Sequence, residues 1–392
     1  MSLVVTGCII LLAVLGHGYF WIDGVNRLHA WAGPRFLIDY PTYAALLAFI
    51  ALPPLVVWDW WHLEIGLAGY VWSQAGFLPR YLQFYACWGV ARLVLNQIHS
   101  RQVDSPNTLL SRRQERSNLV PAGNPLPVRG VATQVLAKIP GNQCLQLAVE
   151  FKRLAIPRLH AELEGLKIAH LSDLHMTGQI ERRWFEAVVH QTNLLEPDVV
   201  AITGDILEKE ACWHWLPETL GRLRAKYGVY FILGNHDFFV DANQTTQLLR
   251  NAGLLYATGN WIESQWNNMA VSITGNERPW GVDQLDQQNL AERGPDQLPL
   301  KIVLAHSPDQ FAWSCRQDAD LVLAGHTHGG QIRFPLLGAV ACPSLHGTRY
   351  ACGTFRSGKT VMHVSRGISG ERPMRWNCPP EVALLELSRG AQ

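Results

Sequence analysis

An uncharged run near the start of the chain is long enough to cross a lipid bilayer, and it constrains the fold more than any other feature. Residues 3–22 contain no Asp, Glu, Lys or Arg. As an α-helix, a run of this length spans a hydrocarbon core of about 30 Å. Tyr19, Phe20 and Trp21 suit the aromatic belt at a membrane surface. A cleaved signal peptide is disfavoured because no basic residue precedes the run and no small-residue cleavage site follows it.

Two further apolar stretches follow. Residues 41–58 form the second candidate span, which Pro53 and Pro54 could kink or make re-entrant. Residues 77–95 carry Arg80 and Arg92, so this stretch can either span the bilayer or lie in its interface. The first 98 residues hold only four of the 33 Lys and Arg residues and four of the 32 Asp and Glu residues. We therefore interpret residues 1–98 as a membrane region of two or three helices, in preference to core helices of a soluble protein.

The basic residues predict how the chain is oriented. A cluster follows the last apolar stretch: Arg101, Arg112, Arg113 and Arg116. Because basic segments stay on the cytoplasmic side, this cluster places the C-terminal part there with either two or three spans. The eight cysteines form no paired framework, which agrees with a reducing compartment. The chain is thus expected to be a multi-pass protein of the inner (cytoplasmic) membrane, with the lipid bilayer as a partner.

The remainder of the chain divides in two. Residues 99–145 are polar and rich in Pro and Gly, so they are predicted to be a linker with, at most, a short strand near 128–136. Residues 146–388 alternate β-rich runs with amphipathic stretches, which is typical of an α/β fold. The strands are expected at 166–171, 198–202, 229–233, 269–273, 301–305 and 320–323, and the helices at 180–195, 213–226 and 241–252.

Polar residues come immediately after five of these predicted strands. They are Asp173 and His175, then Asp205, then Asn235 and His236, then His306, and finally His326 and His328. In open α/β sheets, ligands bind at the carboxyl ends of the strands, so these side chains are expected to converge. His170 and His363 lie inside predicted strands and are expected to be core residues.

The residue types point to bound metal ions. His, Asp and Asn suit Mn, Fe, Zn or Mg, and no Cys joins them. One ion needs three or four protein ligands, so this many candidates suit two ions that share a bridging carboxylate. Two such ions can hold both oxygens of an in-line displacement at phosphorus. Gly204, Gly234 and Gly325 are expected to let the backbone turn sharply beside the ions.

These motifs resemble the calcineurin-like metallophosphoesterases over roughly residues 146–388. The motifs are Asp173-Leu-His175, Gly204-Asp205, Gly234-Asn235-His236-Asp237, His306 and Gly325-His326-Thr-His328. The resemblance implies a four-layer α/β/β/α sandwich and two divalent ions, with Mn²⁺ expected and Fe, Zn or Mg as alternatives. It also implies two ligand sets: Asp173, His175, Asp205 and His328 for one ion, and Asp205 as a bridge with Asn235, His306 and His326 for the other.

The same resemblance gives His236 a different role. It would not bind metal but would stabilise transition-state charge and protonate the leaving oxygen. Asp237 would orient His236 or, equally, cap the next helix. Glu208 stands where many relatives have Asp, at a position that is not a ligand, so this departure is expected to matter little.

Secondary motifs resemble the bacterial membrane-linked branch of the family. They are Gly329-Gly330-Gln331 and the segments 304–309, 365–367 and 375–381. That branch includes enzymes that cleave UDP-2,3-diacylglucosamine in lipid A synthesis, which makes this lipid-linked compound the specific substrate expected. Arg278, the 280–298 insert and the 366–375 loop are expected to form the acceptor pocket.

Three alternative functions differ from this one. A broad phosphodiesterase or phosphomonoesterase would act on other phospholipids, nucleotides or phosphoproteins. A membrane scaffold with a vestigial site is disfavoured because none of the expected ligands is missing. Nucleic acid is not expected as a partner, because the formal net charge is only +1 and the chain is attached to a membrane.

Overall fold

The chain divides into two compact units. The computed structural model describes residues 3–62, 66, 69–70, 77–120, 123–281, 299–335 and 337–389. The helical unit comprises Met1–Arg101 together with Pro335–Arg349, and the sheet unit comprises Gln102–Phe334 and Tyr350–Gln392.

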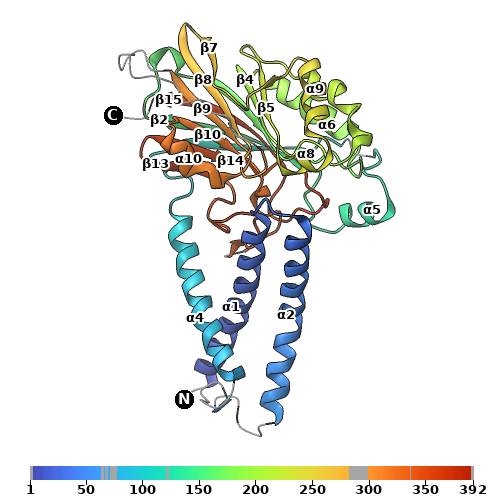
Figure 1. Cartoon of the computed structure of the whole chain (residues 1–392), viewed down its shortest axis with the longest axis vertical. Helices are drawn as coiled ribbons and strands as arrows, with labels where there is room; N and C mark the ends of the chain where they lie inside the picture. The colour runs from blue at the N-terminus through green and yellow to red at the C-terminus, as the bar shows by residue number, and fades with distance from the viewer. Residues whose placement is uncertain are drawn as a thin grey trace. The chain divides into compact units, whose positions relative to one another are not determined.

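Three long helices build the helical unit: α1 (Leu3–His29), α2 (Arg35–His62) and α4 (Phe77–Ser100) (Figure 1). Two stretches, Val4–His29 and Phe36–His62, are long and apolar enough to cross a membrane. α4 is also a continuous helix, but it is not among the stretches that are long and apolar enough to cross a membrane. α2 contains Pro53 and Pro54 without interruption, so the re-entrant alternative is wrong for this segment.

α1 and α4 pack closely through two glycines and one ion pair. A Cβ atom on Gly16 would lie 1.7 Å from the carbonyl oxygen of Tyr85, and one on Gly89 would lie 2.4 Å from a carbonyl oxygen of α1. Such close approach of two backbones is the usual role of small residues at helix crossings in membranes. Asp23 of α1 and Arg92 of α4 are buried and lie 2.9 Å apart, so each charge has its partner within the helical unit.

The segment Pro335–Arg349 belongs to the helical unit although it lies inside the predicted domain 146–388. The side chain of Asn26 on α1 donates to the carbonyl of Val340 (3.3 Å) and accepts from the backbone N–H of Cys342 (2.9 Å). These long-range bonds satisfy backbone groups of the segment, which periodicity along the sequence does not indicate.

The sheet unit contains two large sheets. The first has the order β1 (Leu109–Ser117), β2 (Leu147–Ile156), β15 (Glu381–Arg389), β3 (Lys167–Leu171), β4 (Val199–Thr203), β5 (Val229–Ile232) and β6 (Leu255–Tyr256). The second has the order β13 (Gly353–Ser357), β14 (Thr360–Val364), β10 (Leu321–Ala324), β9 (Leu300–Ala305), β8 (Met269–Asn276) and β7 (Ile262–Trp266). Short strands β11 (Arg333–Phe334) and β12 (Gly338–Ala339) lie outside them.

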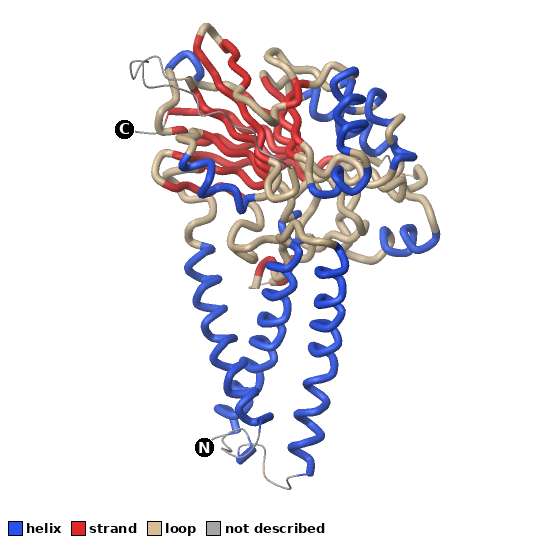
Figure 2. The backbone as a smooth tube through the Cα atoms, in the orientation of Figure 1, coloured by secondary structure: helices blue, strands red, loops and turns tan. Residues whose placement is uncertain are grey.

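The buried side chains show how the layers stack. Ile168 and Tyr230 of the first sheet share one core with Ile302 of the second, so the two sheets pack face to face. Helix α6 (Arg182–Leu194) covers the other face of the first sheet through Phe185, and α10 (Phe311–Arg316) covers the second. Figure 2 shows the strands in red at the centre of this unit, with blue helices outside. The expected α/β/β/α sandwich is confirmed.

Most predicted elements appear within one or two residues of their expected ends, but one predicted helix does not. α6 and α9 (Ala242–Asn251) match the expected helices. The segment 213–226 instead forms the short α7 (Trp215–Glu218) and a 3₁₀ turn, Leu220–Arg222. α7 ends at Thr219, where the backbone leaves the helical region (φ −112°, ψ −84°) and the hydroxyl donates to the carbonyl of Trp215.

The segment 99–145 is not simply a linker. β1 pairs antiparallel with β2 at the edge of the first sheet, and α5 (Val131–Ala137) is a helix where a short strand was considered. β1 is exposed along nearly its whole length, so it carries no alternation of apolar and polar residues. Arg112 helps to hold the strand through two 2.8 Å bonds to buried Glu150.

Candidate metal centre

The structure brings all seven expected ligands together. Each follows a strand of the sheet unit: Asp173 and His175 follow β3, Asp205 follows β4, Asn235 follows β5, His306 follows β9, and His326 and His328 follow β10. All seven are buried. The two sheets meet at this point, since His306 Nδ1 of one lies 2.7 Å from the carbonyl oxygen of Thr203 in the other.

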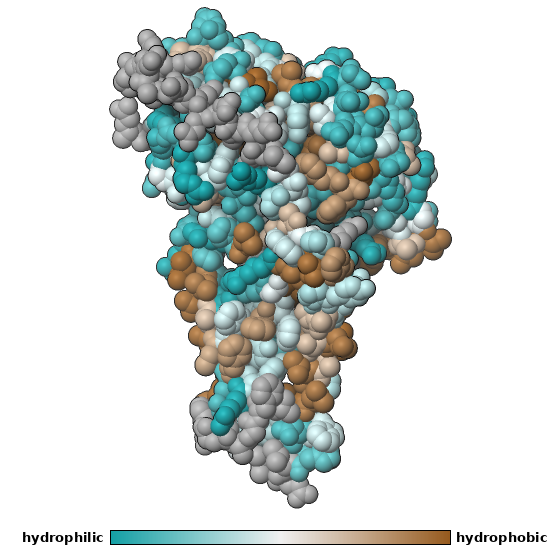
Figure 3. Space-filling model, viewed as in Figure 1, coloured by the Kyte–Doolittle hydropathy of each residue, from teal (hydrophilic) through white to brown (hydrophobic). Residues whose placement is uncertain are grey.

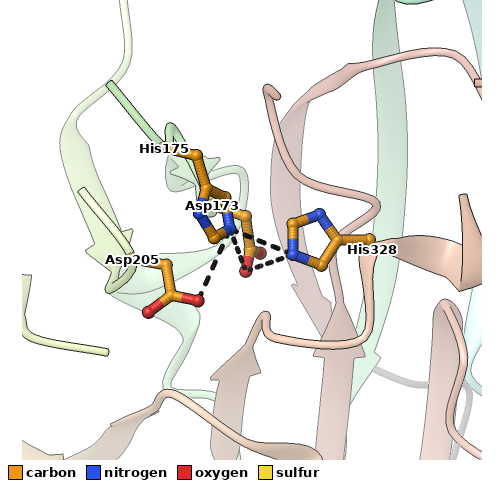
Figure 4. Close-up of side chains that lie close together, drawn as sticks. All are labelled: Asp173, His175, Asp205 and His328. Carbon is orange, nitrogen blue, oxygen red and sulfur yellow. Dashed lines mark hydrogen bonds and ion pairs between the residues drawn. The ribbon is translucent and has the colours of Figure 1, made fainter. Parts of the chain in front are cut away.

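The first group of donors is Asp173, His175, Asp205 and His328 (Figure 4). Their ligand atoms all lie within 4.8 Å of one another. His175 Nε2 is 3.0 Å from His328 Nε2 and 3.5 Å from Asp205 Oδ2. His328 Nε2 is 3.5 Å from Asp173 Oδ1. Two imidazole nitrogens and two carboxylates around one point form a donor set that fits a divalent cation.

The second group shares Asp205 with the first. Asp205, His306 and His326 have ligand atoms within 4.8 Å of one another, and His306 Nε2 lies 3.3 Å from Asp205 Oδ2. Asn235 Oδ1 lies 3.0 Å from the same histidine nitrogen. His326 Nε2 is buried and has no hydrogen-bond partner among the described residues. A buried nitrogen of this kind is costly unless a ligand or ion satisfies it, so these residues fit a second ion. The arrangement is that of a dinuclear-type metal site.

The backbone is strained at most of these positions. Five of the seven residues have a positive φ: Asp173 (51°), His175 (43°), Asp205 (51°), His326 (69°) and His328 (51°). Non-glycine residues rarely adopt this left-handed region, and such strain is concentrated at functional sites. The loops therefore adopt a strained backbone conformation that directs these side chains toward one another.

The three glycines act in two different ways. Gly204 has φ 87°, as expected for a sharp turn. Gly234 has φ −110°, and neither it nor Gly325 is left-handed. They are needed instead for close approach, because a Cβ on Gly234 would lie 2.2 Å from Asp205 Oδ1 and one on Gly325 would lie 1.8 Å from Ser172 Oγ.

Backbone groups hold the donors in place. The N–H of His326 donates to both carboxylate oxygens of Asp173, at 3.0 and 3.1 Å. Nδ1 of His306 faces the Thr203 carbonyl, and Nδ1 of His328 lies 3.2 Å from the carbonyl of Ser369. A carbonyl facing Nδ1 keeps the proton on that nitrogen, which leaves Nε2 of both rings available to a metal.

His236 lies beside the two groups and is held by carboxylates. Its backbone N–H donates to Asp205 Oδ1 (2.9 Å), and its Nδ1 lies 2.8 Å from Glu208 Oε1. Glu208 also contacts His175 Nδ1. Burial alone would lower the pKa of His236, but Asp205 and Glu208 outweigh burial and raise it to about 9. Burial likewise opposes ionisation of Glu208, yet His175 and His236 lower its pKa to about 2.

Two roles were predicted for Asp237 as equal alternatives, to orient His236 or to cap the next helix, and the contacts of its carboxylate favour the cap. The Asp237 carboxylate accepts from the backbone N–H groups of Gly234 (2.8 Å), Ile206 (3.0 Å) and Leu207 (2.9 Å). It therefore ties two ligand loops together and caps α8 (Asn235–Val240), which was the alternative interpretation. The orienting role of Glu208 was not predicted from the sequence. This residue lies three positions after Asp205 and was considered only as a possible metal ligand.

The two core histidines form part of a buried polar network. His170 and His363 are fully buried, with their Nδ1 atoms 2.8 Å apart, which agrees with the structural role expected. Lys152 Nζ lies 2.8 Å from His363 Nε2 and 2.8 Å from Glu381. His170 Nε2 lies 2.9 Å from the hydroxyl of Thr203.

The expected acceptor pocket is only partly recovered. Trp280 lies against the donors, with its ring 4.9 Å from that of His326. Most of the 280–298 insert, residues 282–298, lies outside the described residues. Arg366 and Arg375 are not available to a substrate. Arg366 is buried between Glu150 and Glu381 at 2.8 Å each, and Arg375 donates to the carbonyl of Arg366 at 2.5 Å.

Comparisons with known proteins agree with this site. Residues 166–330 match the family model described as calcineurin-like phosphoesterase. The metallophosphoesterase YkuE of Bacillus subtilis is 29% identical over 57% of this chain and 79% of its own length. The phosphodiesterase YaeI of Escherichia coli is 28% identical over 56% of this chain and 82% of its own.

One mammalian relative is named as a transmembrane protein. A bovine protein named transmembrane protein with metallophosphoesterase domain is 34% identical over 61% of this chain. The match covers 57% of the bovine protein, so this chain spans less than two thirds of that relative.

Proposed function

We propose, from the premise that this chain carries a calcineurin-like metallophosphoesterase domain, that it hydrolyses a phosphoric ester or pyrophosphate bond with two divalent metal ions. One observation carries the proposal. Asp205 Oδ2 lies 3.5 Å from a histidine of the first donor group and 3.3 Å from a histidine of the second, which is where a bridging carboxylate is needed. The first ion would be held by Asp173, His175, Asp205 and His328, and the second by Asp205, Asn235, His306 and His326.

The residues around the ions define the chemistry. When bound, the two ions would neutralise phosphoryl oxygens and lower the pKa of the attacking water. His236 would donate a proton to the leaving oxygen, with Glu208 holding its Nδ1 at 2.8 Å. Bound ions would oppose the effect of Asp205 on the pKa of His236 and so favour release of its proton to the leaving oxygen. We propose Mn²⁺ as the metal, on the basis of the mixed oxygen and imidazole donors.

The membrane proposal rests on the helices and on one relative. α2 exposes large apolar side chains along its length, among them Leu46, Leu47, Ile50 and Val57, and brown residues cover much of the helical unit in Figure 3. An exposed surface of this kind suits lipid. We place the helical unit across the cytoplasmic membrane and the sheet unit on its cytoplasmic side. A reporter fused after Arg389 should be protected from protease added to intact spheroplasts, and cleavage there would reject this orientation.

For the substrate, we propose a lipid-linked phosphoric ester, with UDP-2,3-diacylglucosamine as the specific compound. The resemblance of the secondary motifs and the membrane helices support this choice. Purified full-length protein with Mn²⁺ should release UMP from UDP-2,3-diacylglucosamine, whereas the Asp205→Asn variant should not. Turnover of a generic phosphodiester without release of UMP would reject the specific substrate and favour a broad phosphodiesterase, a function that the name of the E. coli relative supports. A vestigial scaffold would show neither reaction.

A further inference from the structure

We infer that a cationic groove next to the metal centre binds a second anionic group of the substrate, an inference that rests on the phosphohydrolase activity proposed above. The groove is a cavity of about 490 Å³ in the sheet unit. Its walls come from the loop before α5, the loop after β3, the start of α6 and the loop after β4.

Chain connectivity places the groove beside the metal centre. Thr177 of its wall is two residues after His175, and Lys209 directly follows Glu208. Since consecutive Cα atoms are 3.8 Å apart, the wall begins within about 8 Å of the Cα atom of His175. The two loops are fastened side by side, because the N–H of Met176 donates to the carbonyl of Ile206 at 3.1 Å. None of the seven metal-ligand candidates lines the groove, so a ligand at the metals would enter it by passing Thr177 and Lys209.

The side chains that line the groove carry more positive than negative charge. Four cationic residues face two carboxylates: Arg129, Arg182, Arg183 and Lys209 against Glu181 and Glu186. Two of the arginines are structural. Arg183 bonds to Glu181 at 2.7 Å and to two backbone carbonyls at 3.0 Å, and Arg182 pairs with Glu186 at 3.0 Å.

The other two cations are available. Arg129 Nε is 3.6 Å from its nearest carboxylate, that of Glu181, and its side chain is 70% exposed. Lys209 is exposed, and within the part of the chain that the structure describes its ammonium makes no hydrogen bond or ion pair. Neither side chain must break a strong contact to turn toward an anion.

A phosphate group is the ligand that this chemistry fits. The planar fork of an arginine and the ammonium of a lysine are the usual donors to phosphate oxygens in proteins. With the scissile phosphoryl group at the metals, the groove would hold a neighbouring phosphate, as in a pyrophosphate diester or a nucleoside diphosphate. The groove thus selects substrates with two adjacent anionic groups over simple phosphodiesters.

Paired nucleotides test this inference without turnover. UDP and UMP, and likewise ADP and AMP, differ by one phosphate. Binding to the metal-loaded full-length protein in detergent is measured by calorimetry for the wild type and the double variant Arg129→Ala/Lys209→Ala. We expect the wild type to bind each diphosphate about tenfold more tightly than its monophosphate, and the double variant less than threefold more tightly.

A matched variant controls for charge. Arg224→Ala/Lys226→Ala removes two exposed cations of the sheet unit outside the groove and should keep the wild-type preference. An equal affinity of the wild type for both members of each pair, or a preference that survives the groove variant, would overturn the inference. Failure to hydrolyse any phosphoric ester would reject the proposed function instead, and the affinity ratios would still report on the groove.

Discussion

Glu208 Oε1 lies 2.8 Å from Nδ1 of His236, and the same carboxylate contacts Nδ1 of His175. One side chain thus orients a metal-ligand candidate and the expected proton donor. The Glu208 side chain is long enough to reach both rings. A carboxylate that holds one imidazole nitrogen fixes the direction of the other, so Glu208 is a positioning residue for the proposed reaction.

Removing the Glu208 carboxylate should lower kcat more than it weakens substrate binding. We expect Glu208→Ala to lower kcat about 100-fold at saturating Mn²⁺, because general acid catalysis contributes about 10²–10⁴-fold. Glu208→Gln, which keeps an acceptor oxygen, should lose about tenfold. Steady-state kinetics on bis(p-nitrophenyl) phosphate provide the measurement. Glu210→Ala, two residues further on, is the matched control, and an equal loss in both alanine variants would argue against the positioning role.

The close approach at Gly234 predicts a sharp intolerance of any side chain. Gly234→Ala should abolish metal binding at the second site, because the added Cβ would lie 2.2 Å from Asp205 Oδ1. Metal content by mass spectrometry, together with circular dichroism to verify folding, measures this effect. Gly24→Ala is a control, since a Cβ at Gly24 would meet nothing within 4 Å. A Gly234→Ala protein with full metal content would contradict the packing described here.

The pH dependence of stability should report on Glu277. Its carboxylate is buried and accepts from the N–H of Leu233 (2.7 Å) and the hydroxyl of Tyr256 (2.9 Å). Burial raises its pKa from 4.5 to about 7. Between these values the unfolded chain has lost the proton that the native protein keeps, so the free energy of unfolding falls as pH rises through this window.

Glu277→Gln removes this dependence. Relative to the wild type, the variant should gain stability on the order of 3 kcal/mol between pH 4.5 and pH 7, at about 1.4 kcal/mol per pKa unit. Melting temperatures of the two proteins across this range give the comparison. A constant difference between them across this range would show that folding does not raise the pKa of Glu277.

The close packing of α1 on α4 leads to a separate prediction. Gly16→Val should break the packing of α1 on α4, because even a Cβ atom would lie 1.7 Å from the carbonyl of Tyr85. We expect a lower yield of folded protein in membranes and loss of cross-linking between cysteines introduced into the two helices. Gly18→Val lies on the same helix with nothing within 4 Å of its Cβ position and should cross-link normally. Equal cross-linking in both variants would contradict the α1–α4 contact.

Predictions from the sequence were most accurate for the elements that a single physical rule determines. The strands before Asp173, Asp205 and His306 were found because they are short runs rich in apolar residues, and their carboxyl ends located the site. β1 was missed because its side chains are exposed on both faces, so it shows no alternation of apolar and polar residues. The roles of Glu208 and Asp237 depend on contacts between loops 30 residues apart, such as that of Asp237 with the N–H of Leu207, which spacing along the chain does not encode.

Seven buried side chains are expected to hold two ions, and both ions are expected to be needed for hydrolysis. Titration of the metal-free full-length protein with Mn²⁺, recording bis(p-nitrophenyl) phosphate hydrolysis at each addition, tests this expectation most directly. We expect activity that rises until two ions are bound per chain, and an Asp205→Asn variant that stays inactive at every loading. Full activity at one ion per chain, or an active Asp205→Asn variant, would contradict it.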